Sequence, residues 1–284
     1  MGTLINKIDF AAIVIVKNAN PNGDPLNGNR PRVNYDGYGE LSDVCIKRKI
    51  RNRLMNNGQS IFVQSDDNRV DEYRSLRQRA EGALKNVNMK DEANYRDAAC
   101  KQWLDVRAFG QVFAYKGGEE SGVSIGIRGP VSIHPAFSVV PVLDRVSSIQ
   151  ITKSVSGEGD GTKRGSDTMG MKHRVDHGVY VFYGSMNPQL ATRTGFSDED
   201  ALAVKEALKT LFRNDASSAR PEGSMEVYKV YWWEHNTPNG QYSSAKVHRL
   251  LQVKPKTEEP NSIEDYAIEL SNLPGLKCEV IDGE

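Results

Sequence analysis

The chain has 284 residues, enough to bury a sizeable core in one large domain or two small ones. Hydrophobic residues make up 38% and charged residues 26%, and no apolar run approaches the length of a membrane span, so we expect a globular protein with no membrane partner. Three widely spaced cysteines exclude a disulfide framework and a zinc knuckle, and with no signal-peptide core at the N-terminus they predict a reducing, cytoplasmic setting.

The net charge is zero, but the charges are unevenly distributed. Residues 42–56 hold five basic residues and a single acid, whereas residues 257–284 hold eight acids and a single base. A neutral total can therefore hide a basic face and an acidic tail. For the tail, the favoured interpretation is a solvated C-terminal segment.

The N-terminal part predicts a strand, a loop and a basic helix. Residues 8–16 (IDFAAIVIV) are nearly all apolar and rich in β-branched types, which predicts a central strand buried on both faces. The loop at 17–32 is crowded with Asn, Gly and Pro. Residues 41–58 predict a helix that Ser42 caps and that ends at a left-handed Gly58. Its core stripe is formed by Ile46, Ile50 and Leu54.

The remaining segments complete an α+β pattern. Residues 64–105 are polar and predict a partly helical insertion on the outside of the domain. A second helix is expected at 197–212, with Ser197 and Asp200 forming a capping box and with a buried side made of Leu202, Leu208, Leu211 and Phe212. Further strands are expected at 106–115, 122–135, 178–186, 225–235 and 246–253. The order matches the split β-α-β-β-α-β pattern of ferredoxin-like sheets, a common platform for RNA-binding domains.

A long Gly-rich segment interrupts this pattern between 134 and 177. Residues 153–174 contain five glycines and five basic residues. The flanks at 149–155 and 168–175 are predicted to pair as a long hairpin that protrudes from the sheet. A disordered surface loop is the alternative on composition alone.

Clustered basic residues are the main candidates for a binding site, because such clusters mark nucleic-acid binding. On the basic helix the candidates opposite the core stripe are Lys47, Arg48, Lys49 and Arg51; an ordinary solvated face is the alternative. On the hairpin, phosphate contacts are expected from Lys153, Lys163, Arg164 and Lys172, and Met169 is a candidate wedge between bases. Arg107 and Arg128 are candidates for a groove that holds a sugar-phosphate chain, although the glycines near them also suit strand ends.

Signals for catalysis and for metal binding are poor. Asp24 is the carboxylate to test as a general acid or base, but it suits an Asx-turn better. His173 and His177 are four residues apart, yet their segment does not resemble a stable helix and suggests no third ligand. The sequence also lacks the Walker phosphate-binding pattern. We therefore expect no catalytic residue, no metal and no cofactor.

Several sequence motifs, taken together, resemble a known family. They are KNANPNGDP, SDVCIKRKIR, DVRAFG, IRGPVSI, MGMKHRV and TGFSDED, and they occur in this order between about residues 8 and 253. In order and spacing they resemble the Cas-seven-type backbone subunit of CRISPR Cascade surveillance complexes, specifically of the type I-C branch. The acidic segment after residue 255 lies outside these motifs.

The resemblance implies an architecture and a function. The fold would be a modified RRM-like palm at 1–253 with finger (60–105) and thumb (138–175) insertions, followed by an acidic C-terminal extension at 254–284. Copies of the chain would stack head-to-tail along CRISPR RNA, together with other Cascade subunits, in antiviral defence. Each copy would grip the backbone of the guide, which would then pair with target DNA. No enzymatic activity is implied.

The resemblance also assigns roles to residues. The palm contacts would be Lys47, Arg48, Lys49 and Arg51, and the thumb contacts Lys153, Lys163, Arg164, Lys172 and His173. The loop after the first strand would face the guide through Asn18, Asn20, Asn22, Asn27, Arg30 and Arg32, or its amides would bond mainly within the loop. One competing function is a ribonuclease that uses Asp24, as related type III subunits use an Asp. A generic RNA-recognition module is the other, although its aromatic RNP signature is missing.

Overall fold

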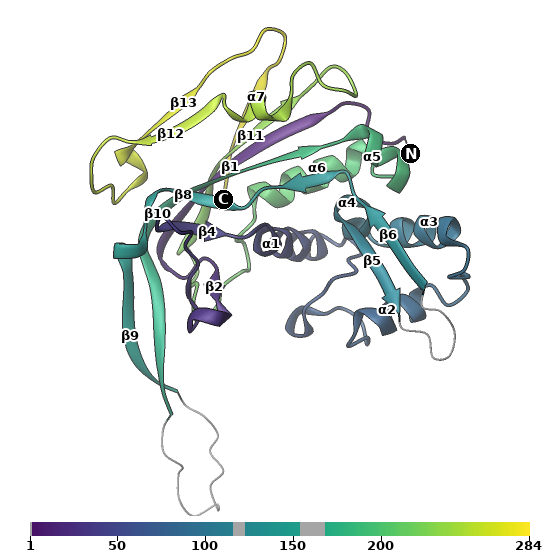
Figure 1. Ribbon diagram of the computed structural model, residues 1–284, viewed down its shortest axis with the longest axis horizontal. Helices are drawn as coiled ribbons and strands as arrows, with labels where there is room; N and C mark the ends of the chain where they lie inside the picture. Colours follow the sequence, from purple (N-terminus) through teal and green to yellow (C-terminus); the bar gives the residue numbers. More distant parts are fainter. Residues whose placement is uncertain (1, 116–122, 154–167) are drawn as a thin grey trace, which may run out of the picture.

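The computed structural model describes residues 2–115, 123–153 and 168–284, which are built around one antiparallel sheet (Figure 1). The main strands lie in the order β14-β11-β1-β10-β8-β4, and β7 and β9 also pair with β10. The bounds are β1 (Ile8–Ala19), β4 (Tyr38–Leu41), β7 (Val131–Ile133), β8 (Ala136–Pro141), β9 (Val146–Lys153), β10 (Thr168–Met186), β11 (Met225–Glu234) and β14 (Cys278–Asp282).

The centre of the sheet follows the predicted split pattern. β1 and β10 are neighbours, with β11 on the far side of β1 and β7 and β8 along β10. Helices α1 (Asp43–Asn56) and α6 (Asp198–Lys209) share one core with one face of these strands. β1 is buried from Ile8 to Val16, as expected of a central strand. The predicted α+β class is thus confirmed.

Both major helices begin and end close to their predicted bounds. Ser42 accepts a hydrogen bond from the Cys45 amide, and Gly58 has a φ of 83° just beyond the end of α1. Ser197 and Asp200 form the predicted capping box of α6. The prediction for Leu202 is wrong, because this side chain is 59% exposed. Ala201 and Val204 pack in the core instead, together with the correctly predicted Leu208, Leu211 and Phe212.

The helical insertion forms a unit with its own apolar core. It comprises α2 (Leu76–Ala83), α3 (Glu92–Gln102), α4 (Leu104–Phe109) and the hairpin of β5 (Gly110–Tyr115) with β6 (Val123–Arg128). The strand predicted at 106–115 is therefore wrong at its start, where α4 runs up to Gly110. The strand predicted at 122–135 is two strands, since β6 pairs with β5 whereas β7 pairs with β10.

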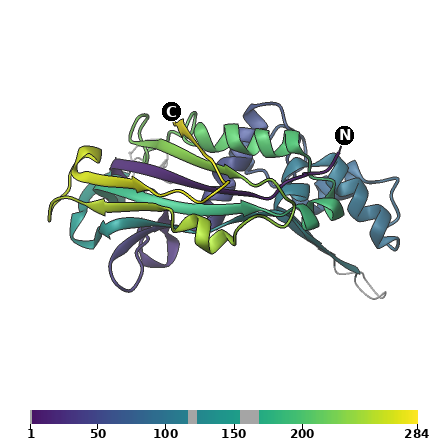
Figure 2. The same ribbon diagram turned by 90° about the horizontal axis from the view of Figure 1, so that it is seen from above.

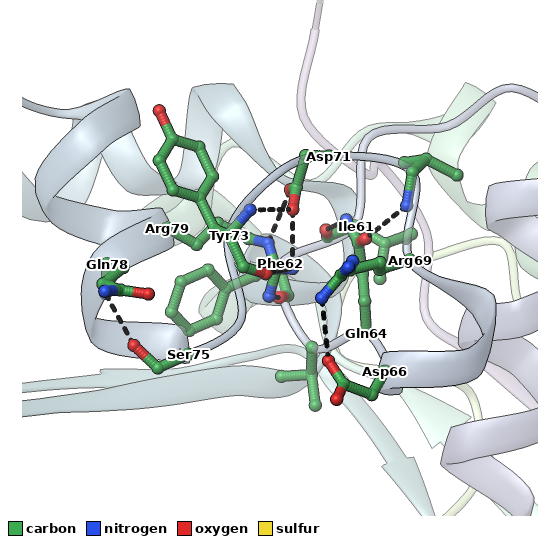
Figure 3. Close-up of polar contacts among 12 residues, drawn as sticks. Ile61, Phe62, Gln64, Asp66, Arg69, Asp71, Tyr73, Ser75, Gln78 and Arg79 are labelled. Carbon is green, nitrogen blue, oxygen red and sulfur yellow. Dashed lines mark hydrogen bonds and ion pairs between the residues drawn. The ribbon is translucent and has the colours of Figure 1, made fainter.

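A buried arginine organises the polar part of this insertion (Figure 3). The Arg79 guanidinium donates to both carboxylate oxygens of Asp71, at 2.6 and 2.8 Å, and to the carbonyls of Phe62 and Tyr73, both at 3.0 Å. Bidentate, charge-assisted bonds of this kind hold their partners in a fixed geometry. They fix the loop that precedes α2 (Figure 3).

The predicted hairpin is present in the described residues. β9 and β10 pair from Val146 opposite Val175 to Lys153 opposite Thr168, and they project away from the sheet (Figure 1). β10 then continues into the sheet, where it pairs with β1. Lys163 and Arg164 lie outside the described residues.

The C-terminal segment covers the second face of the sheet and extends its edge. Helix α7 (Ser244–His248) and the hairpin of β12 (Leu251–Pro255) with β13 (Tyr266–Leu270) pack against this face, and Figure 2 shows α6 and α7 on opposite sides of the central strands. β14 pairs with β11. The interpretation of a solvated tail is therefore wrong, and the strand predicted at 246–253 is helix α7 followed by β12.

Within the described ranges, no helix combines the length and the apolar character that crossing a membrane would require.

Candidate nucleic-acid interface

A polar cavity of about 630 Å³ lies beside α1 and is the natural starting point for a binding site. It is bounded by α1, the segment after β1, the segment before α2 and the segment after α6. Its lining includes five asparagines and three basic residues, namely Asn22, Asn52, Asn56, Asn68, Asn214, Arg48, Lys49 and Arg220. Side-chain amides both donate and accept hydrogen bonds, and three bases lie here against the acids Asp67 and Asp215, so this lining suits a polar chain better than an apolar ligand.

Two bases of α1 line this cavity, and they differ in their surroundings. Lys49 is 4% exposed and forms an ion pair with Asp215, and its ammonium lies 5.3 Å from the centre of the Phe212 ring. Burial lowers the pKa of Lys49, and Asp215 partly offsets this effect. Arg48 donates to the Val63 carbonyl at 3.1 Å. Its pKa is also lowered by burial, and the like charge of Arg51 adds to the effect.

The other predicted bases of α1 are paired as well. Arg51 lies 2.9 Å from Asp105, a residue that is 1% exposed, and stacks 5.0 Å from the Phe109 ring. Lys47 pairs with Asp43 at 2.9 Å on the helix surface. These ion pairs tie α1 to its neighbours, and a phosphate would have to replace or supplement them. Their contact with RNA stays a prediction.

The asparagines of the predicted loop are used in two ways. Asn22 accepts hydrogen bonds from the amide and the hydroxyl of Ser42, both at 2.9 Å, and so holds the start of α1. Asn20 is 2% exposed and donates to the Asn29 carbonyl at 2.7 Å, while its own oxygen has no partner in the described structure. Asn18 and Asn27 are exposed. Bonding within and around the loop therefore fixes its shape through Asn20 and Asn22, whereas Asn18 and Asn27 face solvent.

Asp24 has a structural position in this loop. Its carboxylate accepts a hydrogen bond from the Leu26 amide at 3.2 Å and so caps the short turn at 25–27, and it lies 3.5 Å from Arg32. This is the behaviour of an Asx-turn residue, the interpretation preferred for it in the sequence.

The loop and the root of the hairpin come together. Arg30 lies in the short strand β3 (Arg30–Pro31), which pairs with β2 (Gly23–Asp24) and packs against β10. His173 of β10 is 8% exposed, and its Nδ1 lies 2.7 Å from the Ser148 hydroxyl. Burial lowers the pKa of His173, and the charge of Arg30 lowers it further. Lys172 is half-buried and, as the preceding residue of β10, points to the opposite face of the hairpin, and Lys153 and Met169 lie on the paired strands.

Arg107 and Arg128 lie apart from the residues around the α1 cavity and the hairpin root. Arg107 makes a bidentate pair with Asp200, with both distances 2.7 Å, and lines a separate cavity of about 630 Å³ between α3, α5 (Pro188–Thr194) and α6. Arg128 is exposed at the end of β6. The groove predicted from these two arginines is therefore not a single surface with the α1 cavity.

Several residues that line the cavity beside α1 were not among those predicted from the sequence. Asn52 and Asn56 are four apart on α1, and this spacing was a usable signal for a shared face. Asp215 and Arg220, which lie 3.1 Å apart, come from an irregular segment with no recognisable pattern. Among the described residues, no group of three or more His, Cys, Asp or Glu side chains is arranged to hold a metal ion.

A family model for CRISPR-associated protein Cas7 matches residues 6–271. The chain belongs to the Cas7 family. A curated relative, CRISPR-associated protein Cas7 of Haloferax volcanii, is 24% identical over 286 aligned positions, which cover 95% of this chain and 82% of the relative.

Two solved structures are also similar to this chain. One is a chain of a "CRISPR RNA-guided surveillance complex, pre-nicking", with 15% identity, a TM-score of 0.45 and coverage of 80% of this chain and 78% of that one. The other is a chain of a "CRISPR RNA-guided surveillance complex", with 19% identity, a TM-score of 0.41 and coverage of 80% and 68%.

Proposed function

We propose that this Cas7-family chain is a non-catalytic backbone subunit of the type I-C branch that binds CRISPR RNA in the cytoplasm. Copies polymerise head-to-tail along the guide, bind other Cascade subunits, and present the guide for pairing with target DNA. The observation that carries the proposal is the match of the Cas7 family model to residues 6–271.

The arrangement of the fold supports this function. In Figure 1, α1, the loop at β2, the β9–β10 hairpin and the helical insertion all lie toward the β4 edge of the sheet. We assign the sheet domain (1–253) to a palm, 60–105 to fingers and 138–175 to a thumb. The described finger unit continues to the end of β6 at Arg128.

We further propose a path for the guide backbone over this side. It runs from the polar cavity at Arg48 and Lys49 to the root of the hairpin at Arg30, Lys172 and His173. Contacts to phosphates carry no sequence information, so binding is strong, salt-dependent and indifferent to the guide's sequence. Specificity then comes from base pairing by the guide.

The test is co-purification of the protein expressed together with its guide RNA, followed by sizing and sequencing of the bound nucleic acid. The expected result is protected RNA in a large assembly, with a length that rises in fixed steps as subunits are added. Single-stranded RNA of unrelated sequence serves as the control for sequence indifference.

A monomer free of nucleic acid that does not bind guide RNA at low salt would contradict the proposal. Shortening of the guide by the purified protein, abolished by Asp24→Ala, would favour the ribonuclease instead.

A further inference from the structure

The carboxylates of β14 and the residues just after it pair with a row of basic residues on the neighbouring elements. Glu279 lies 2.5 Å from Lys205 of α6, and Asp282 lies 2.5 Å from Lys229 of β11. Glu284 pairs with Lys209 at 3.3 Å and also with Arg213. The acidic residues at this end of the chain thus meet basic residues at one edge of the sheet.

This basic row continues the basic face of α1. Arg53 of α1 donates to the Thr210 hydroxyl at 3.1 Å, just beyond the end of α6. Burial lowers the pKa of Arg53, and the next contribution is the like charge of Arg213. α1 and α6 pack side by side on the same sheet face. Arg53 itself is 4% exposed, so without the acidic strand the accessible positive charge beside α1 would be that of Lys205, Lys209 and Arg213 at the C-terminal end of α6.

The bases concerned are accessible enough to meet a ligand. The exposed fractions are 18% for the Lys205 side chain, 31% for Lys209 and 53% for Arg213. A polyanion that reached this edge would therefore find basic side chains within reach, but each already has a carboxylate beside it.

We propose that Glu279 and Glu284 act as an electrostatic shield that prevents RNA from binding along α6 and confines it to the α1 side. This proposal rests on the proposed RNA binding at α1, and it sets one limit of the RNA-binding surface. Exposed ion pairs of this kind contribute little to folding, typically 0 to about 1 kcal/mol. Their effect on a polyanion is larger, because each base that is neutralised internally is one fewer contact for a phosphate.

The test compares two variants that remove the same charge. Glu279→Gln with Glu284→Gln frees Lys205 and Arg213 and removes one of the two carboxylates beside Lys209, whose ammonium also lies 3.8 Å from Glu206. Glu258→Gln with Glu259→Gln removes two exposed acids of the same segment that lie outside β14. Binding of an unrelated single-stranded RNA oligonucleotide is measured from low to high salt with the full chain.

The β14 variant is expected to bind the oligonucleotide at least about tenfold more tightly near 0.1 M salt. The slope of log K against log salt should steepen by about 1.4, because Lys205 and Arg213 each gain a phosphate contact and each contact on a single strand adds about 0.7. The control variant should bind as the wild type does. Adding Lys205→Gln, Lys209→Gln and Arg213→Gln to the β14 variant should abolish the gain.

Equal gains in the two acidic variants would overturn the inference, since net charge alone would then explain the effect. No gain in a β14 variant that unfolds at the wild-type temperature would overturn it as well. These outcomes differ from a failure of the proposed function, in which the wild-type chain itself does not assemble with guide RNA.

Discussion

Helix α1 and the root of the β9–β10 hairpin are both predicted to hold phosphates, and the structure gives their basic residues different surroundings. On α1, Lys49 and Arg51 are paired with Asp215 and Asp105 and are largely buried. At the hairpin root, no carboxylate among the described residues forms an ion pair with Arg30 or Lys172, and both side chains are half-buried.

Similar basic clusters in a sequence can therefore have different roles in the folded chain. A buried, paired base holds elements together, whereas an accessible base without a carboxylate partner offers its charge to a ligand. Because the residue types are the same, only their acidic neighbours, distant in the sequence, distinguish the two roles.

The largest effect is expected from breaking the buried pair on α1. Asp215→Ala leaves the Lys49 ammonium buried without its partner, and we expect the free energy of unfolding to fall by about 3 kcal/mol. Lys47→Ala removes an exposed pair on the same helix and should cost less than about 1 kcal/mol. Denaturant unfolding measures both, and equal losses would show that Lys49 is no more structural than Lys47.

The next effect concerns binding at the hairpin root. Arg30→Gln with Lys172→Gln should weaken RNA binding about tenfold and reduce the salt slope by about 1.4, because two phosphate contacts are lost. Folding stability should change little. Lys254→Gln with Lys256→Gln, two exposed bases at and just after β12, is the control for the loss of two positive charges. An unchanged salt slope would remove these two residues from the RNA path.

A smaller effect is expected from pH. Burial lowers the pKa of His177, helped by the charge of Arg145, and burial also lowers the pKa of His248 despite the nearby Asp9. As pH falls through about 6.5, the unfolded chain takes up protons at these histidines before the folded chain does. The free energy of unfolding should therefore decrease below about pH 6.5 and be flat between about pH 6.5 and 8, above which the raised thiol pKa values of Cys45, Cys100 and Cys278 lower it again. In denaturant titrations at several pH values, His177→Gln should flatten this decrease.

The smallest effect is expected at Asp24. Asp24→Ala removes a capping hydrogen bond from a short turn and should cost about 0.5 to 1 kcal/mol. RNA binding and the length of bound RNA should not change, as sequencing of the bound RNA will show. A change in RNA length would give Asp24 a chemical role.

Local signals in the sequence are sufficient to predict much of the fold. The caps of α1 and α6 depend on Ser42, Ser197 and Asp200, which act within a few residues of their own position. The pairing of β9 with the hairpin part of β10 was predicted from signals that are equally local, namely the two flanks of one Gly-rich segment. For this reason the central strand, both helices and the hairpin were predictable.

Other features depend on distant contacts and were not predictable. Residues 104–109 form α4 rather than a strand, and Asp105 there accepts hydrogen bonds from the Phe62 and Val63 amides, at 2.7 and 3.1 Å. The pairing of β14 with β11 likewise joins segments that are far apart in the sequence. For the site, the basic helix was found, but not the partners Asp215 and Arg220 that decide which of its residues are accessible.

The uninterrupted length of β10 determines how a force on the hairpin reaches the sheet. The strand runs for 19 residues without a break, about 60 Å, and serves both as a central strand of the sheet and as one arm of the hairpin. The base of the hairpin is thus held in the sheet, because β10 continues into it and pairs with β1 on one side and with β7 and β8 on the other. A load applied along the hairpin is carried directly into the central strands of the sheet, with no hinge loop in between.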